Sequence, residues 1–142
     1  MEQKTTTPVL HDCCTIIGAL NGRPSSLAFK EKLSRRKDVT LMVPDVAISE
    51  VARVARMSAE AAEQAVRSFA HGKVVRIADD AAMVDAIALT VRYDYCHYPD
   101  SIYLVHCRNA GAVLVTYDRK LREVARLEAI MACAPESFRF YQ

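Results

Sequence analysis

Four acidic residues are the strongest candidates for chemistry in this sequence: Asp12, Glu50, Asp100 and Asp118. Asp12 and Asp118 each follow a short apolar run, "PVLH" and "AVLVTY", while Glu50 and Asp100 lie in segments with helical periodicity. Carboxylates crowded together raise one another's pKa, and a bound divalent cation is the common way to relieve their repulsion. Hard oxygen ligands favour Mg²⁺ or Mn²⁺ over zinc. The four acids together therefore predict a site for Mg²⁺ or Mn²⁺.

Each acid also has a plainer interpretation when it is taken alone. Glu50 falls inside the apolar arc of its helix, where its carboxylate can still reach water. Asp100 follows a proline and can be a first-turn acid that complements the helix dipole. Asp118 can cap the helix that begins at Arg119, and Asp12 can be a turn residue. The metal site is favoured because all four positions fit one arrangement.

Such a site supports hydrolysis of a phosphodiester, because divalent ions activate water and stabilise the leaving oxygen. The acids alone would repel a nucleic acid, so flanking cations are needed. The segment "FKEKLSRRKD" is the densest basic run, and a second basic group directly follows Asp118. We expect RNA contacts from Lys30, Lys32, Arg35, Arg36, Arg119 and Lys120, with Lys37 and Arg122 beside them. The alternative for the first run is a solvated helix face whose charge is offset by Glu31 and Asp38.

Other polar residues near Asp100 are weaker candidates. Four tyrosines can stack on bases of single-stranded RNA, although a core or dimer-interface role is commoner: Tyr93, Tyr95, Tyr98 and Tyr103. Metal-dependent hydrolysis requires no histidine base, so we expect structural roles for His97 and His106. Among the remaining acids we expect helix caps or solvated side chains at Asp79, Asp80 and Asp85, and an accessory role at most for Asp94.

The elements that must position these residues alternate between strands and helices. We expect strands over residues 8–12, 39–43, 73–78, 112–116 and 137–141. We expect helices over residues 13–20, 26–38, 45–57, 59–71, 81–95, 100–111 and 119–131, with Pro44, Ser58 and Gly72 at helix ends. Strands separated by helices argue for a parallel sheet covered on both faces. In such an α/β fold ligands gather outside the carboxyl ends of the strands, where Asp12 and Asp118 are expected.

Length and composition fit one globular domain over residues 1–142. The chain has 142 residues, of which 51% are hydrophobic and 25% charged, and its net charge of +2 is too small to indicate a nucleic-acid binder by itself. The polar N-terminus lacks a signal-peptide core, and no apolar run reaches membrane-spanning length, which favours a cytoplasmic protein. Five cysteines without a C-x-x-C pair suit reduced thiols better than a zinc site.

The order of the acids resembles the PIN-domain family over nearly the whole chain. The resemblance lies in "VLHDCCTII" with Asp12, "VPDVAISEV" with Glu50, "HYPDSIYLVHCRNAG" with Asp100, and "AVLVTYDRKL" with Thr116 and Asp118. It implies a three-layer α/β/α fold with a central, mainly parallel sheet. It also implies metal-dependent cleavage of RNA, with these four acids as metal ligands and Thr116 supporting the site. The family usually places a small hydroxyl residue and then a polar one after the first aspartate, whereas Cys13 and Cys14 follow here.

Small proteins of this family are most often VapC-type toxins. The resemblance therefore implies a homodimer that is held inactive by a small antitoxin protein. An RNA-processing nuclease without an antitoxin is a second hypothesis. A catalytically weak or inactive RNA-binding or assembly module is a third, and the cysteines after Asp12 favour it. A phosphoacceptor receiver domain is a further rival, but it would need paired acids after the first strand, which "VLHDCC" does not supply.

Overall fold

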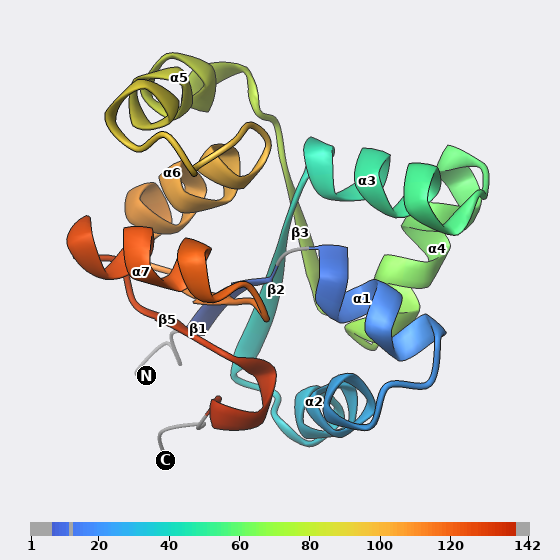
Figure 1. Cartoon of the computed structure of the whole chain (residues 1–142). Helices are drawn as coiled ribbons and strands as arrows, with labels where there is room; N and C mark the ends of the chain where they lie inside the picture. Colours follow the sequence, from blue (N-terminus) through green and yellow to red (C-terminus); the bar gives the residue numbers. More distant parts are fainter. Residues whose placement is uncertain (1–6, 12, 139–142) are drawn as a thin grey trace, which may run out of the picture.

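The computed structural model describes residues 7–11 and 13–138 as strands, helices and their connections (Figure 1). The strands are β1 (Thr7–His11), β2 (Val39–Pro44), β3 (Val74–Ile77), β4 (Val113–Val115) and β5 (Ala132–Cys133). The α-helices are α1 (Cys13–Leu20), α2 (Pro24–Arg35), α3 (Asp45–Ala55), α4 (Ala59–Phe69), α5 (Met83–Arg92), α6 (Asp100–Ala110) and α7 (Arg119–Leu127). Two short 3-10 helices are η1 (Asp80–Ala82) and η2 (Pro135–Ser137).

The strands form one parallel sheet in the order β3-β2-β1-β4-β5. Val9 of the central strand β1 lies opposite Leu41 on one side and Val113 on the other. The chain first moves outward from β1 to β3 and then returns past β1 to β4, so the direction of winding reverses between β1 and β4. Right-handed crossovers then place α1 to α4 on one face and α5 to α7 on the other (Figure 1). The predicted three-layer α/β/α fold with a parallel sheet is confirmed.

Helix α6 is the most deeply buried helix of the described chain. Residues 101–107 are all buried, because α6 packs against β1 and β4 on one side and against α5 on the other. Its interior position explains the weak amphipathic pattern of "DSIYLVHCRNA", in which Ser101 and His106 are buried beside Leu104. A buried helix cannot shift easily, so the position of Asp100 at its first turn is fixed by the core.

The C-terminal elements differ from the prediction. The helix predicted over residues 119–131 ends at Leu127, and Ala129 takes a left-handed backbone with φ 57°. The chain then forms the short strand β5, whose Ala132 lies opposite Leu114 of β4. The strand predicted over residues 137–141 is wrong where it can be compared, because Ser137 belongs to η2. Pro135 begins that turn, and the buried Phe138 ring meets Phe29 edge-on at 5.4 Å.

Smaller differences concern helix ends. Pro24 starts α2 two residues before the predicted start, and α5 ends at Arg92 rather than at residue 95. The predicted cap at Ser58 is confirmed, since its hydroxyl accepts a hydrogen bond from the Ala61 amide at 3.1 Å. Within residues 7–11 and 13–138, no helix is long and apolar enough to cross a membrane.

Candidate metal centre

Three of the four predicted acids lie around the point where the winding reverses. Glu50 is on the second turn of α3, which follows β2 directly; Asp100 is the first residue of α6; and Asp118 precedes α7. Burial raises the pKa of Asp100 to about 6, and the negative charges of Asp118 and then Glu50 add to the rise, while His97 opposes it. The charges of Asp118 and Glu50 therefore act on the carboxyl group of Asp100. Asp12, predicted as the fourth, connects β1 to α1 in the sequence and lies outside the described residues.

Asp118 is held by hydrogen bonds to its side-chain carboxylate and from its backbone amide. Its Oδ1 accepts from the Lys120 amide at 2.9 Å and from the Leu121 amide at 3.2 Å, which caps α7. The fully buried Thr116 hydroxyl accepts from the Asp118 amide at 3.1 Å. Both cap bonds use Oδ1, so Oδ2 is available for another ligand as far as the described residues are concerned. The cap role and the ligand role predicted for Asp118 are therefore compatible in one side chain.

Cys96 belongs to the surroundings of the acids. Burial raises the pKa of its thiol to about 11, and the charges of Asp100 and Asp118 contribute further. The sequence marked Cys96 only as one of several thiols in apolar segments. Its four-residue distance from Asp100 in the chain was the one available signal that it lies near the site.

Asp79 joins the helix that carries Glu50 to the helix that carries Asp100. Its Oδ2 accepts from the Val46 amide at the start of α3 at 2.9 Å, and its Oδ1 bonds to Nε2 of His106 on α6 at 2.8 Å. The Asp79 side chain is only 12% exposed. The prediction of a cap for the following helix is wrong, because Asp79 makes no side-chain cap bond to η1 and instead serves the distant start of α3. His106 is structural in this arrangement, as expected.

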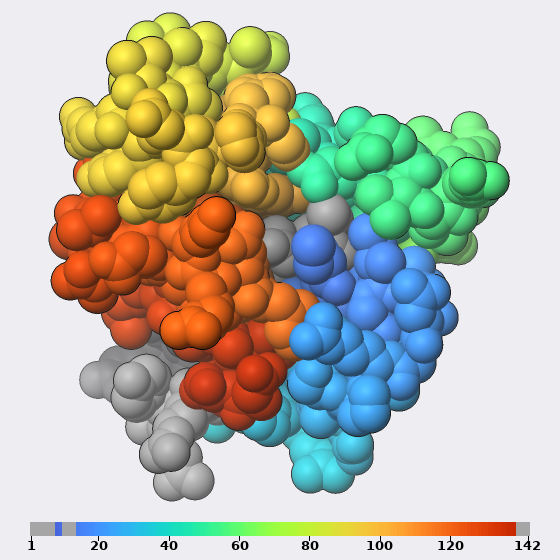
Figure 2. Space-filling view, in the orientation of Figure 1, coloured from blue at the N-terminus to red at the C-terminus, as the bar shows by residue number. Residues whose placement is uncertain are grey.

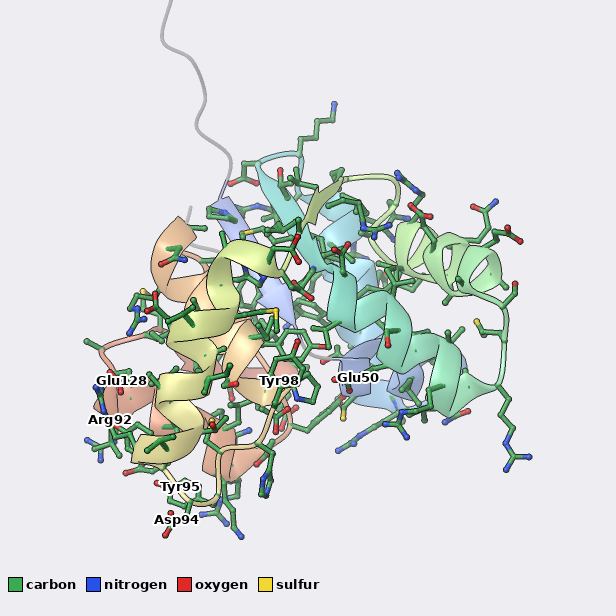
Figure 3. The ribbon with its side chains drawn as sticks, turned by 90° about the horizontal axis from the view of Figure 1, so that it is seen from above. Glu50, Arg92, Asp94, Tyr95, Tyr98 and Glu128 are labelled. Atoms are coloured by element: carbon green, nitrogen blue, oxygen red, sulfur yellow. The ribbon has the colours of Figure 1, made fainter. Side chains whose placement is uncertain are left out.

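Other predicted candidates divide clearly in the structure. Figure 3 shows Asp94 and Tyr95 on the connection after α5, well away from Glu50. Tyr103 is fully buried in the core, whereas Tyr98 is half exposed. Asp80 and Asp85 are exposed near the start of α5, as expected for solvated acids.

The two predicted basic groups also differ. In the first group, Arg35 pairs with Glu31 at 2.6 Å and Arg36 pairs with Asp38 at 2.8 Å, so local acids offset these charges as the solvated-face alternative expects. Lys30 and Lys32 are partly buried on α2. In the second group, Arg119 and Lys120 are exposed and pair with no acid among the described residues. The cations beside Asp118 are thus the more available ones.

The carboxylates fit a hard divalent cation by their chemistry, and the charges of Asp118 and Glu50 add to the rise that burial causes in the pKa of Asp100. Among residues 7–11 and 13–138, no three side chains of His, Cys, Asp or Glu stand close enough together to hold a metal ion by themselves. Asp12, the fourth predicted ligand, lies outside these residues. The arrangement, acids at the carboxyl ends of parallel strands beside exposed cations, suits an anionic substrate.

Comparison with known proteins bears on the same region. The sequence model described as the PIN domain matches residues 9–127. The structure of FitAB bound to an IR36 DNA fragment superposes with a TM-score of 0.63 at 14% identity, covering 94% of this chain and 99% of the other. PAE2754 from Pyrobaculum aerophilum superposes with a TM-score of 0.54 at 18% identity, covering 88% and 98%. At these identities the likeness shows the fold. A comparison with curated proteins found no match.

The raised pKa of Asp100 predicts a pH-dependent cost to stability. The folded protein has a pKa of about 6 at Asp100 against an ordinary 3.8, so it binds this proton more tightly than the unfolded chain does. The free energy of unfolding should therefore fall as pH rises from about 4 to about 6 and stay lower above that. Asp100→Asn should remove this fall and, without metal, exceed the native stability at about pH 7 by roughly 1 kcal/mol, discounted because the carboxyl is partly open to solvent. Urea unfolding with a chelator across this range measures it, and parallel pH profiles for both proteins would contradict it.

The Asp79 bridge predicts a large difference between two neighbouring acids. Asp79→Ala leaves the Val46 amide and the buried His106 ring without their partner, which should cost about 1–3 kcal/mol of unfolding free energy. Asp80→Ala is the matched control, because Asp80 is exposed and should change stability by no more than about 0.5 kcal/mol. Denaturant unfolding of both variants is the measurement. Equal losses in the two would show that the bridge contributes nothing.

Proposed function

The chain belongs to the PIN-domain family, and from this membership and its acidic site we propose that it is a metal-dependent ribonuclease. PIN domains are generally nucleases that use divalent metal ions. The observation that carries the proposal is the coupling of Asp100 to Asp118 and Glu50 at the carboxyl edge of the sheet. Acids gathered at that edge have an evident use in binding a cation and little use in stabilising the fold.

The proposed ligands of Mg²⁺ or Mn²⁺ are Asp12, Glu50, Asp100 and Asp118, and the bound ion would activate water and stabilise the leaving oxygen. The chain's own contribution is to hold the carboxylates in place before substrate arrives. The buried helix α6 fixes Asp100, and Thr116 with the amides of α7 fixes Asp118. Cations beside the acids, Arg119 and Lys120 foremost, would hold phosphates of the RNA, with Lys30, Lys32, Arg35 and Arg36 as the more distant candidates.

A toxin of the VapC type is the role that we propose for this nuclease, with a small antitoxin protein as its partner. The support is the family membership and the resemblance of the four acidic motifs to that group. We place the protein in the cytoplasm, where Cys96, Cys107 and Cys133, which are free cysteines in the described chain, would stay reduced.

Replacement of Asp118 by asparagine tests the nuclease. Asparagine is also a good N-cap, so Asp118→Asn should leave α7 intact while it weakens the ligand field of the ion. Cleavage of a mixed structured and single-stranded RNA pool should depend on Mg²⁺ or Mn²⁺ and fall by about a hundredfold or more in the variant, since loss of even an outer partner of a metal ligand costs roughly 10- to 100-fold.

The matched control for this experiment is Asp94→Asn, which removes one exposed carboxylate away from Glu50 and should cleave like the native protein. Native activity in the Asp118 variant would contradict the proposed site. Absence of cleavage by folded, partner-free native protein under either metal would favour the inactive RNA-binding module instead.

Helix α5 is the surface that we propose for a homodimer. Val84, Ile87, Ala88 and Val91 are all exposed and lie along one line of the helix, opposite its buried face. Two copies of α5 packed antiparallel about a two-fold axis would bury this stripe against itself, with the small Ala88 near the centre. The same arrangement brings Asp85 of one copy beside Arg92 of the other, so the charges at the rim are complementary.

The α5 interface predicts that one charged residue in the stripe will separate the two copies. Ile87→Lys should give a folded monomer, because a lysine facing its own copy across the axis meets like charge and apolar surface. Leu27→Lys is the control, since Leu27 is similarly exposed on α2. Sedimentation equilibrium of the native protein and both variants measures whether each is a monomer or a dimer. A monomeric native protein, or a dimer that survives the Ile87 change, would refute the interface.

A further inference from the structure

An arginine lies over the ring of Tyr117, one residue from Asp118. The Arg23 guanidinium carbon lies 3.5 Å from the centroid of the Tyr117 ring. The Tyr117 hydroxyl is bonded to the hydroxyls of Ser25 and Ser26 at 2.5 and 2.7 Å, and the buried Thr116 precedes it in the chain. The ring is therefore fixed at both ends, and the arginine lies on a rigid support.

The support is tightly built from the connection between α1 and α2. The Arg23 amide donates to the Gly18 carbonyl at 2.7 Å, and the Arg23 carbonyl accepts from the Leu27 amide at 3.0 Å. A Cβ at Gly18 would stand 2.4 Å from Oγ of Ser26, so only glycine lets α1 approach the serine that holds Tyr117. Figure 2 shows this segment, in blue, beside the orange segment that contains α7.

The cations of this surface form no ion pairs within the described chain. Arg23 is exposed and pairs with no described acid, and the same holds for Arg119 and Lys120. Arg119 and Lys120 directly follow Asp118, whose carboxylate caps α7. Exposed cations gathered beside the acids are complementary to an anion that arrives from solution.

We propose that Arg23, supported by Tyr117, is a stacking platform for an unpaired base of single-stranded RNA next to the phosphate that is cleaved. A guanidinium plane with one face on a tyrosine ring offers its other face to a base, and its N–H groups reach a neighbouring phosphate. Arg119 and Lys120 hold the phosphates that follow. Only an unpaired nucleotide can turn its base onto such a platform, so the site selects single-stranded RNA. This inference rests on the proposed ribonuclease function.

The test separates stacking from charge by using binding without cleavage. In the Asp118→Asn background with Mg²⁺, fluorescence anisotropy gives the affinity for a short single-stranded RNA and for the same RNA with one abasic position in turn. Arg23→Ala should weaken binding of the intact RNA by roughly 5- to 150-fold, the range that one base–side-chain stack contributes. It should weaken binding much less when the abasic position is the one on the platform. Arg23→Lys keeps the positive charge but lacks the guanidinium plane, so its affinity for the intact RNA should be close to that of Arg23→Ala.

Arg126→Ala is the matched control, because Arg126 is an exposed arginine at the far end of α7 and its loss changes the net charge equally. The platform is refuted if Arg23→Ala behaves like this control, if no abasic position reduces its effect, or if Arg23→Lys restores full affinity. These outcomes are independent of the nuclease. If the native protein cleaves RNA and replacement of Arg23 does not change RNA binding, only the platform is refuted. If RNA binding depends on Arg23 but the native protein does not cleave RNA, only the nuclease is refuted.

Discussion

Burial of Asp100 beside two other carboxylates is the constraint on which the arrangement of this protein depends. Glu50 and Asp100 lie on two helices and Asp118 precedes a third, and burial together with the charges of Asp118 and Glu50 raises the pKa of Asp100 to about 6. Left to themselves these side chains would move apart into water. Separate interactions hold each acid in place. Burial of residues 101–107 fixes α6 and with it Asp100, the cap bonds and Thr116 fix Asp118, and Asp79 fixes the start of α3, the helix that carries Glu50. The core thus holds a charge arrangement that a cation would stabilise.

Asp79 shows how a residue outside the site can set its dimensions. It lies before η1, yet it bonds to the start of α3 and to His106 in the middle of α6. The helices that carry Glu50 and Asp100 belong to opposite faces of the sheet. A buried carboxylate between a backbone amide and a histidine spans the two layers with well-directed bonds. Its position one residue from the exposed Asp80 gives no sign of this role in the sequence.

The sequence was sufficient for the parts of the fold that depend on local pattern. Apolar runs separated by helical periodicity indicated a parallel sheet, Ser58 was recognisable as a cap, and Asp118 was expected both to cap α7 and to face the carboxyl edge. The failures were non-local. The strand β5 has two residues and exists only because β4 offers an unpaired edge. The bond from Tyr117 to Ser25 joins residues 92 positions apart, and no periodicity could indicate it.

The acids at the carboxyl edge of the sheet and the cations beside them have complementary roles. Acids at this edge repel a polyanion until a cation is present, while the exposed cations that follow Asp118 attract one. Under the proposed function, one nucleic-acid strand with its divalent ion would satisfy both sets of charges at once. The free protein carries the two sets side by side, and the hydrogen bonds of Thr116 and Tyr117 keep them adjacent. The crowding of acids at one edge of the sheet would then contribute to binding of a substrate that supplies both charges.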